Sequence, residues 1–496
     1  MAPIGPGYAT PLDAMRSGPR EELLYVISIQ PNPGEGKSDL LATVDVNPKS
    51  PTYCQIIHML KTGNQNDELH HSGWNVCSSC YHVAEGCVAP VRDKLVMPAL
   101  GSDRVYIVDT GKNPRAPVMH KVIDASEMHE FNCATPHTTH CLPTGEIMIS
   151  TMGDVNGNAR GNFILIDGKT YKTKGTWIKG TWIKGKEAKF NYDYWYQPYF
   201  DVMISSEWGV PKVFKKGFQL ADAVDPEVYG RSLNVFSWKK RELLQTINLG
   251  DDGIAPLEVR FLHDPKKPIG FVGCGVNATL FRFFPKDGKW AVAKAFSIPA
   301  KKVTGWIEDK MRGLVTDILL SLDDKYLYLS NWTHGDIRQY DISNPENPKL
   351  VSQVFLGGLI QTDSSIKVIE DEELTKQPEP VFVKGRRIYG APQMLQLSLD
   401  GKRLYSVITL GQAILSRVCQ NRQLLTLLSP WDKQFYPECV KTGSFLLKLD
   451  VDVINGGMTL DKDFYVDFTN TPEGPLLAHE MRYPGGDCTS DIWLAD

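Results

Sequence analysis

The residues most able to do chemistry are histidines gathered in short polar motifs. The chain has eleven histidines. Several lie in motifs that are far apart in the sequence: residues 67–74 with His70 and His71, 136–141 with His137 and His140, 331–336 with His334, and 478–483 with His479; His263, in 260–264, is a further candidate. Imidazole is the commonest metal ligand in proteins, and histidines from separate elements can converge on one ion. The motifs therefore predict a metal centre.

The spacing limits the backbone that can deliver these ligands. On a regular strand the adjacent His70 and His71 would point to opposite faces, so both can bind one ion only from a loop or a bulge. The same limit holds for His137 and His140, and Pro136 favours irregular backbone there.

Acidic residues in the same motifs are expected to accept hydrogen bonds from the ring nitrogens that do not bind metal. These are Glu68, Glu480 and Asp336. The alternative for any single histidine is an ordinary hydrogen-bonded side chain. We interpret the histidines without such a polar context as structural, namely His58, His82, His120 and His129.

Cys77 and Cys80 form a C-x-x-C pair. Cys87 and His82 could complete a zinc site, although the spacing is unusual for one. A thioredoxin-like pair would open a helix in a βαβ unit, and the sequence predicts no such unit. A soft-ligand or chalcogen-binding thiol pair and two reduced loop cysteines both stay open. Cys141 and Cys488 flank the histidine and glycine motifs, which puts them near the same predicted centre.

A repeated turn predicts the elements that position these residues. Each copy is a strand ending in Asp, an Asn-Pro-x-x-Pro turn and a second strand, and the copies turn at residues 47–51, 113–117 and 344–348. Proline fixes φ and ends the strand, and asparagine starts the turn. A second pattern, a turn feeding an alternating strand, recurs at 321–328 and 398–405.

Long periods filled with short strands predict an all-β, single-domain β-propeller over residues 1–496. Six to eight blades fit the length, and we favour seven. The loops and inner strands of several blades meet at a central channel, which would bring distant histidines together. A pair of β-sandwiches is the alternative.

Composition narrows the function further. Length alone would suggest about three domains, and the net charge of −4 makes nucleic acid an unexpected partner. Ten cysteines in 496 residues are too sparse for a disulfide scaffold. We see neither a signal peptide nor a transmembrane run. The sequence therefore predicts a cytosolic protein with reduced thiols.

Together the motifs resemble the selenium-binding protein family, whose animal and bacterial members include methanethiol oxidases. The similarity extends over nearly the whole chain, and the strings that carry it are residues 5–11, 41–45, 67–75, 77–80, 137–141, 194–198, 256–263, 334–341 and 478–488.

The resemblance implies a propeller that oxidises methanethiol with O₂ and water to formaldehyde, hydrogen sulfide and hydrogen peroxide at a histidine-bound copper. The implied ligands are His70, His71, His140 and His479, with His137 next. His263 and His334 are expected to be channel residues, together with Glu68 and Glu480. Imidazole-bound copper suits a soft thiolate substrate, whereas zinc fits the ligands but not O₂ chemistry.

The family name also implies selenium bound at a cysteine, for which Cys54, Cys77 and Cys80 are the candidates. The alternative function is a non-catalytic selenium- or thiol-binding propeller that acts in selenium handling or intracellular protein transport. Nuclear and peripheral-membrane locations are implied beside the cytosol.

This sequence departs from the family pattern at four places. Residues 175–185 carry a local duplication, and Tyr199-Phe200 and Arg231-Ser232 stand where relatives carry a histidine. An insertion lies within roughly 410–428. Its leucines and arginines are consistent with an amphipathic partner or membrane-surface helix; a gene-model error or an irregular loop is the alternative.

Overall fold

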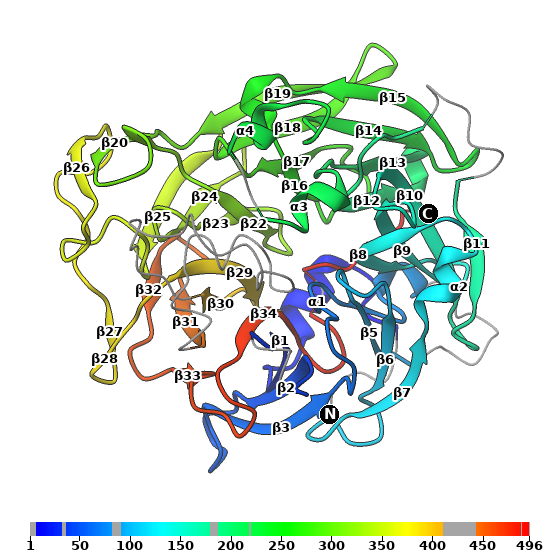
Figure 1. Cartoon of the computed structure of the whole chain (residues 1–496), viewed down its shortest axis with the longest axis horizontal. Helices are drawn as coiled ribbons and strands as arrows, with labels where there is room; N and C mark the ends of the chain where they lie inside the picture. The colour runs from blue at the N-terminus through cyan, green and yellow to red at the C-terminus, as the bar shows by residue number, and fades with distance from the viewer. Residues whose placement is uncertain are drawn as a thin grey trace.

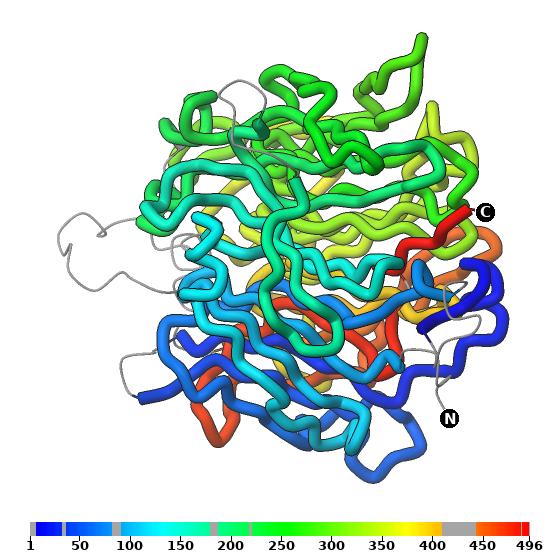
Figure 2. Tube along the Cα trace, turned by 90° about the vertical axis from the view of Figure 1, so that its right-hand side faces the viewer, coloured from blue at the N-terminus to red at the C-terminus, as the bar shows by residue number. Residues whose placement is uncertain are grey.

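The computed structural model describes residues 6–31, 36–81, 91–178, 187–217, 220–409, 443–487 and 489–495. These residues form antiparallel sheets arranged in a ring, and the chain passes once around it (Figure 1). In Figure 2 both chain ends lie on the same side of the ring. The predicted all-β propeller is confirmed.

Seven sheets of four or five strands, drawn from the described residues, follow one another along the chain. The first three are β3 (Gln55–Lys61), β2 (Leu40–Asp45), β1 (Leu23–Ile29) and β34 (Leu477–Arg482); β4 (Gly73–Trp74), β5 (Lys94–Pro98), β6 (Val105–Asp109) and β7 (Val118–Ile123); and β8 (Ala134–Cys141), β9 (Glu146–Gly153), β10 (Ala159–Asp167) and β11 (Thr173–Thr176). The number of blades itself stays a prediction.

The other four sheets complete the ring. They are β12 (Tyr194–Gln197), β13 (Val202–Ser205), β14 (Ser232–Ser237) and β15 (Glu242–Asn248); β16 (Pro256–Phe261), β17 (Gly270–Cys274), β18 (Thr279–Lys286) and β19 (Lys289–Ser297); β22 (Val315–Leu320), β23 (Tyr326–Asn331), β24 (Asp336–Asp341) and β25 (Lys349–Phe355); and β29 (Ala391–Leu397), β30 (Arg403–Thr409), β31 (Phe445–Val451) and β32 (Met458–Leu460), with β33 (Val466–Asp467) beside β31.

Smaller elements decorate this frame. β20 (Lys301–Thr304), β21 (Lys310–Met311) and β26 (Lys367–Glu370) form one small sheet, and β27 (Phe382–Val383) pairs with β28 (Arg386–Arg387). The helices are short: α1 (Pro11–Ser17), α2 (Ala125–His129), α3 (Pro211–Phe214), α4 (Leu220–Val224) and the 3₁₀ turns η2 (Ser78–Cys80), η4 (Pro198–Phe200) and η5 (Asp251–Gly253). Within the described ranges, no helix has the length and apolar character needed to cross a bilayer. The predicted insertion at 410–428 lies outside the described residues.

The last strand of the chain closes the ring. β34 pairs antiparallel with β1, with Val26 opposite Met481 and Ile29 opposite Leu477. All seven residues of β1 are buried, as expected for a strand covered on both faces. Pairing the two ends of the chain in one sheet removes an exposed sheet edge.

The repeated Asn-Pro turns connect the two outer strands of their sheets. They join β2 to β3, β6 to β7 and β24 to β25. In the first copy Asp45 accepts hydrogen bonds from the Asn47 amide at 3.1 Å and the Ser50 hydroxyl at 2.6 Å. The aspartate that ends each strand thus also fixes the turn that follows, which confirms the predicted strand–turn–strand unit.

Candidate metal centre

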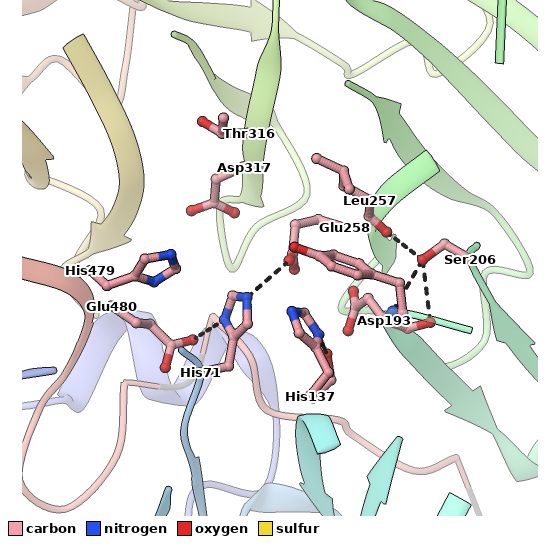
Figure 3. Close-up of polar contacts among 12 residues, drawn as sticks. His71, His137, Asp193, Ser206, Leu257, Glu258, Thr316, Asp317, His479 and Glu480 are labelled. Carbon is pink, nitrogen blue, oxygen red and sulfur yellow. Dashed lines mark hydrogen bonds and ion pairs between the residues drawn. The ribbon is translucent and has the colours of Figure 1, made fainter. Parts of the chain in front are cut away.

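The chemistry-bearing residues lie on or beside the innermost strand of each sheet. These inner strands contact one another around the centre of the ring. β8 carries His137, β34 carries His479 and Glu480, β16 carries Glu258, and β22 carries Asp317. His70 and His71 precede the short strand β4. Sequence positions hundreds of residues apart therefore meet in one place, as Figure 3 shows for part of the group.

Four of the predicted histidines form a close group. Single ligand nitrogens of His70, His71 and His137 all lie within 4.8 Å of one another. The ring centroid of His479 lies 4.0 Å from that of His70 and 5.6 Å from that of His71. His70 and His71 follow Glu68, whose φ is +48°, and their ring planes are 77° apart.

The free nitrogens of the group fit a metal ion. Within the described residues, Nδ1 of His70, Nε2 of His71, Nε2 of His137 and Nδ1 of His479 have no hydrogen-bond partner. A buried polar group left unsatisfied costs about 1–3 kcal/mol, and the cost falls where an ion accepts the lone pair. The donor set, all imidazole, suits copper or zinc.

Burial keeps these rings in the form that binds metal. It lowers the pKa of His70 and of His137 well below the ordinary value, and the neighbouring histidines lower both further. Burial, followed by the nearby His71, lowers the pKa of His479 to about 3. Neutral imidazoles with free lone pairs therefore face one another near neutral pH.

Glu480 holds His71 in place. Its Oε1 lies 3.0 Å from Nδ1 of His71, and its Oε2 accepts from the Ser72 hydroxyl at 2.7 Å. Burial alone would raise the pKa of Glu480, but Arg482 and His71 outweigh it and hold the pKa at about 2. An ionised carboxylate on Nδ1 fixes the tautomer that leaves Nε2 free for metal.

A largely apolar cavity adjoins the histidines. It has a volume of about 90 Å³, and its wall includes Glu68, His70, His137 and His479. Tyr192 also lines it and packs on His137, with ring centroids 3.8 Å apart. The rest of the wall is mostly apolar, with Met152, Trp208, Phe214 and Leu257 among its residues. Such a site takes a small apolar molecule beside the histidines.

The structure does not bring His140 into the group. β8 changes register between Pro136 and Thr139, and His140 packs instead against Tyr194 and Trp195, with ring centroids 5.1 and 5.4 Å away. Burial lowers the pKa of His140 to about 4. His137, three residues earlier on β8, is therefore a better candidate ligand than His140.

His263 and His334 are occupied by hydrogen bonds. The two ring nitrogens of His263 lie 3.1 Å from the carbonyl oxygens of Ser321 and Thr489. His334 contacts the Asn331 side chain at 3.0 Å and the Met311 carbonyl at 3.2 Å. Neither residue is part of the cavity wall. The hydrogen bonds of His263 and His334 therefore join segments of the chain that lie next to each other.

The acidic residues predicted to support the rings differ in their contacts. Glu480 holds His71, and Glu68 lines the cavity. Asp336 instead binds the side chains of Asn331 and Arg338, at 2.8 and 2.7 Å. It reaches His334 through Asn331.

Three buried thiols form a second cluster. Cys77, Cys80 and Cys141 pack together, and the Ser79 hydroxyl lies 3.1, 3.8 and 3.7 Å from their respective sulfurs. The hydrogen bond from Cys141 lowers the pKa of Cys80 to about 7. Cys54 is half-buried in a separate cluster with Tyr53 and Ile56. His82, Cys87 and Cys488 lie outside the described residues.

The departures from the family pattern are placed away from the cavity wall. Tyr199 is 53% exposed. Arg231 donates to Asp251 at 2.8 Å, and the Ser232 amide donates to Glu207 at 3.0 Å. The duplicated segment at 175–185 falls largely outside the described residues.

Sequence reasoning missed Tyr192 and Glu258. Glu258 lies in β16, all six residues of which are buried, together with Arg260. Two opposite charges in a strand with apolar neighbours are the signal that could have found it, because buried charges need a partner. Tyr192 lies two residues before the string 194–198.

Comparison with known proteins places these features in a family. The model of the family described as 56kDa selenium binding protein (SBP56) matches residues 2–494. A Xenopus tropicalis protein named methanethiol oxidase is 54% identical over 492 residues, covering 99% of this chain and 98% of the relative. The mouse selenium-binding protein 2 is 52% identical with the same coverage. The crystal structure of a hypothetical selenium-binding protein from Sulfolobus tokodaii has a TM-score of 0.83 and 35% identity, covering 98% of each chain.

Proposed function

The chain belongs to the 56 kDa selenium-binding protein family, and we propose that it is a methanethiol oxidase that uses O₂ at a copper held by its clustered histidines. The reaction converts methanethiol, O₂ and water to formaldehyde, hydrogen sulfide and hydrogen peroxide. The full-length similarity to a protein named methanethiol oxidase supports the substrate. The observation that carries the proposal is the cluster of His70, His71 and His137, whose ligand nitrogens lie within 4.8 Å of one another beside an apolar cavity.

His70, His71 and His137 would hold the metal, with His479 beside them. Copper bound by imidazoles changes redox state and binds a soft thiolate. Zinc would fit the same nitrogens but supplies no redox chemistry.

The protein's own residues prepare the site. Glu480 orients the His71 ring through its hydrogen bond to Nδ1, and Tyr192 packs on His137. The apolar wall, which includes Trp208 and Phe214, contacts the methyl group and excludes water. A short alkyl thiol fits this arrangement better than a charged one, because the wall offers few polar partners.

The test combines metal analysis with a headspace assay. Purified protein is stripped with a chelator, reloaded with Cu²⁺ and given methanethiol in air. We expect stoichiometric copper and release of hydrogen sulfide and formaldehyde, and loss of both copper and product in a His71→Ala, His137→Ala double variant. Protein that retains no copper and makes no hydrogen sulfide after reloading would refute the proposal. Zinc alone, bound even when copper is supplied, would indicate a structural zinc centre.

A second candidate function is selenium or thiol binding without turnover. The cluster of Cys77, Cys80 and Cys141 around Ser79 supports it, as does the similarity to a protein named selenium-binding protein 2. Protein incubated with selenite and thiol would then carry one selenium per chain, measured by mass spectrometry. The adduct should disappear in Cys80→Ser and persist in Cys133→Ser, whose thiol is buried elsewhere. An adduct that survives Cys80→Ser and is lost in Cys54→Ser would move the site to Cys54.

Cellular location stays a prediction from the sequence. We propose the cytosol, with the nucleus and the membrane surface as further locations. Fractionation of cells that express the tagged full chain, compared with a chain lacking residues 410–428, would test whether the insertion directs membrane contact.

A further inference from the structure

His71 lies between two buried carboxylates. Oε1 of Glu480 is 3.0 Å from its Nδ1, and Oε1 of Glu258 is 4.0 Å from its Nε2 (Figure 3). Both glutamates are almost fully buried, with side-chain exposures of 5% and 4%. The two ring nitrogens of one predicted ligand thus face carboxyl oxygens from two different strands, β34 and β16.

The two carboxylates are not equivalent. Both oxygens of Glu480 are engaged: Oε1 by His71 and by Arg482 at 2.7 Å, and Oε2 by the amide and hydroxyl of Ser72. A carboxylate used in this way orients the ring and has no oxygen directed at the free nitrogens. Glu480 is therefore a positioning residue.

Glu258 directs one oxygen at the cluster. Its Oε2 accepts from Nη2 of Arg260 at 2.6 Å. Arg260 is itself held by Asp193, whose Oδ2 accepts from Nη1 at 2.9 Å. This chain of contacts fixes the carboxylate and turns Oε1 toward Nε2 of His71, the nitrogen that the Glu480 contact leaves free.

The separation of Oε1 and Nε2 points to an ion between them. At 4.0 Å the two atoms are too far apart for a hydrogen bond. Two atoms bound to one metal ion through bonds of about 2.0–2.2 Å lie at most about 4.4 Å apart. The spacing therefore suits two ligands of one ion.

Other buried acidic side chains lie nearby. Asp193 and Glu258 share the guanidinium group of Arg260, and Glu480 and Asp487 share that of Arg482. Asp317 is also buried and interacts with His71. Oδ1 of Asp317 and Oδ1 of Asp193 have no hydrogen-bond partner within the described residues. A bound cation would satisfy such oxygens, because buried polar atoms without a partner are costly.

We propose that Glu258 is a direct oxygen ligand of the metal, completing a mixed imidazole and carboxylate centre on the Nε2 side of His71. The inference rests on the proposed function in that it assumes a metal at the histidine cluster. An anionic oxygen ligand favours the divalent over the monovalent state of copper, since carboxylates are harder ligands than imidazoles or thiolates. Glu258 thereby tunes which redox state the site prefers.

The test compares the full-length wild type with Glu258→Gln and Glu258→Asp after stripping and reloading with Cu²⁺. Affinity is measured by competition with a chelator, and the ligand field by electron paramagnetic resonance of the bound Cu²⁺. We expect Glu258→Gln to weaken Cu²⁺ binding at least tenfold, because even residues that only orient ligands contribute about 10–100-fold. The spectrum should change in both variants, since aspartate keeps the charge but withdraws the oxygen.

The matched control is Glu207→Gln. Glu207 is also buried, but it is held by Asn234 at 3.0 Å and by the amides of Arg231 and Ser232. It should leave affinity and spectrum unchanged. Circular dichroism shows which variants are folded, and Glu258→Asp decides the question if the glutamine variant does not fold.

The outcomes separate this inference from the proposed function. Wild-type affinity and spectrum in a folded Glu258 variant would overturn the ligand role and leave a histidine-bound metal standing. Weaker binding with an unchanged spectrum would also overturn it, because Glu258 would then act through charge alone. Wild-type protein that binds no Cu²⁺ would remove both the inference and the copper centre.

Discussion

Nδ1 of His71 lies 3.0 Å from Oε1 of Glu480, and this contact joins the loop before β4 to β34, the strand that closes the ring. The same strand carries His479, whose ring centroid is 4.0 Å from that of His70. β34 pairs with β1 and also carries His479 and Glu480. The strand that closes the ring therefore contributes to the candidate centre.

The contact predicts that Glu480→Gln weakens metal binding without removing a ligand. Glutamine keeps the size of the side chain, but its neutral amide orients His71 less firmly and removes one of the two carboxylates paired with Arg482. Loss of such an orienting carboxylate lowers metal affinity about 10–100-fold. Competition with a chelator measures the affinity for the metal.

The control is Glu473→Gln, which removes an ion pair with Lys61 at the protein surface and should bind the metal like the wild type. Wild-type affinity in the Glu480 variant would contradict the orienting role.

His137 and His140 offer an internal comparison, because both are buried on β8 three residues apart. His137 lies in the cluster, whereas His140 contacts Tyr194 and Trp195. We expect His137→Ala to lower copper occupancy after dialysis severalfold, and His140→Ala to lower stability while it retains the metal. Metal analysis and urea denaturation of both variants give the two readouts. Copper lost from the His140 variant but kept by the His137 variant would reverse the assignment.

The propeller and most of the cluster could be predicted from the sequence. The Asn-Pro turns mark outer strands, because proline and asparagine act locally. His70, His71 and His479 stand in motifs rich in polar residues, and all three reach the group. The sequence named both His137 and His140 as ligands, with His140 ranked first. Which of the two reaches the group depends on the register shift of β8 against β9. Register is set by cross-strand pairing and not by the spacing of residues along one strand.

Glu258 illustrates a second limit. The motif at 256–263 is one of the strings that resemble the family, and the sequence predicted His263 from it as a channel residue. Glu258 in the same motif was not predicted. In the structure His263 lies beyond the end of β16 and is bound by the Ser321 and Thr489 carbonyl oxygens, while Glu258 on the strand faces His71. Which side of an inner strand meets the channel is decided by packing between neighbouring sheets. The sequence alone shows that successive side chains of the strand point to opposite faces, but not which set of side chains faces the channel.

Cys80 should be the most reactive thiol of its cluster near neutral pH. The hydrogen bond from Cys141 lowers the pKa of Cys80 to about 7, whereas burial raises the pKa of Cys141 well above the ordinary value. The thiolate is the nucleophile, so alkylation at position 80 should rise with pH through about 7 and level off above it. Peptide mapping after brief iodoacetamide treatment measures this. Cys141→Ser should shift the midpoint upward; Cys133→Ser should not, and a midpoint near 9 in the wild type would contradict the lowered pKa.

Ring closure should carry a large share of the stability. Leu477 on β34 is 1% exposed and packs in the same core cluster as Ile29, its partner on β1. Replacing a buried leucine with alanine removes packing and leaves a cavity, which costs about 2–5 kcal/mol. Urea denaturation of Leu477→Ala should show this loss of unfolding free energy. Ile454→Ala is the control because Ile454 is 74% exposed, and such a surface change should stay within about 0.5 kcal/mol.

The apolar wall of the cavity should set the size of thiol that the enzyme accepts. Phe214, on the short helix α3, lines the cavity and packs near Trp208, with ring centroids 6.3 Å apart. Phe214→Leu removes part of the wall without exposing a polar group, so a longer alkyl chain finds room. We expect the ratio of kcat/KM for propanethiol to that for methanethiol to rise about tenfold or more, since one methylene in an apolar pocket is worth about 1–3 kcal/mol.

The matched control is Phe284→Leu on β18, a phenylalanine that is not part of the cavity wall. It should leave the ratio unchanged, and an unchanged ratio in Phe214→Leu would mean that thiols reach the histidines by another face of the channel.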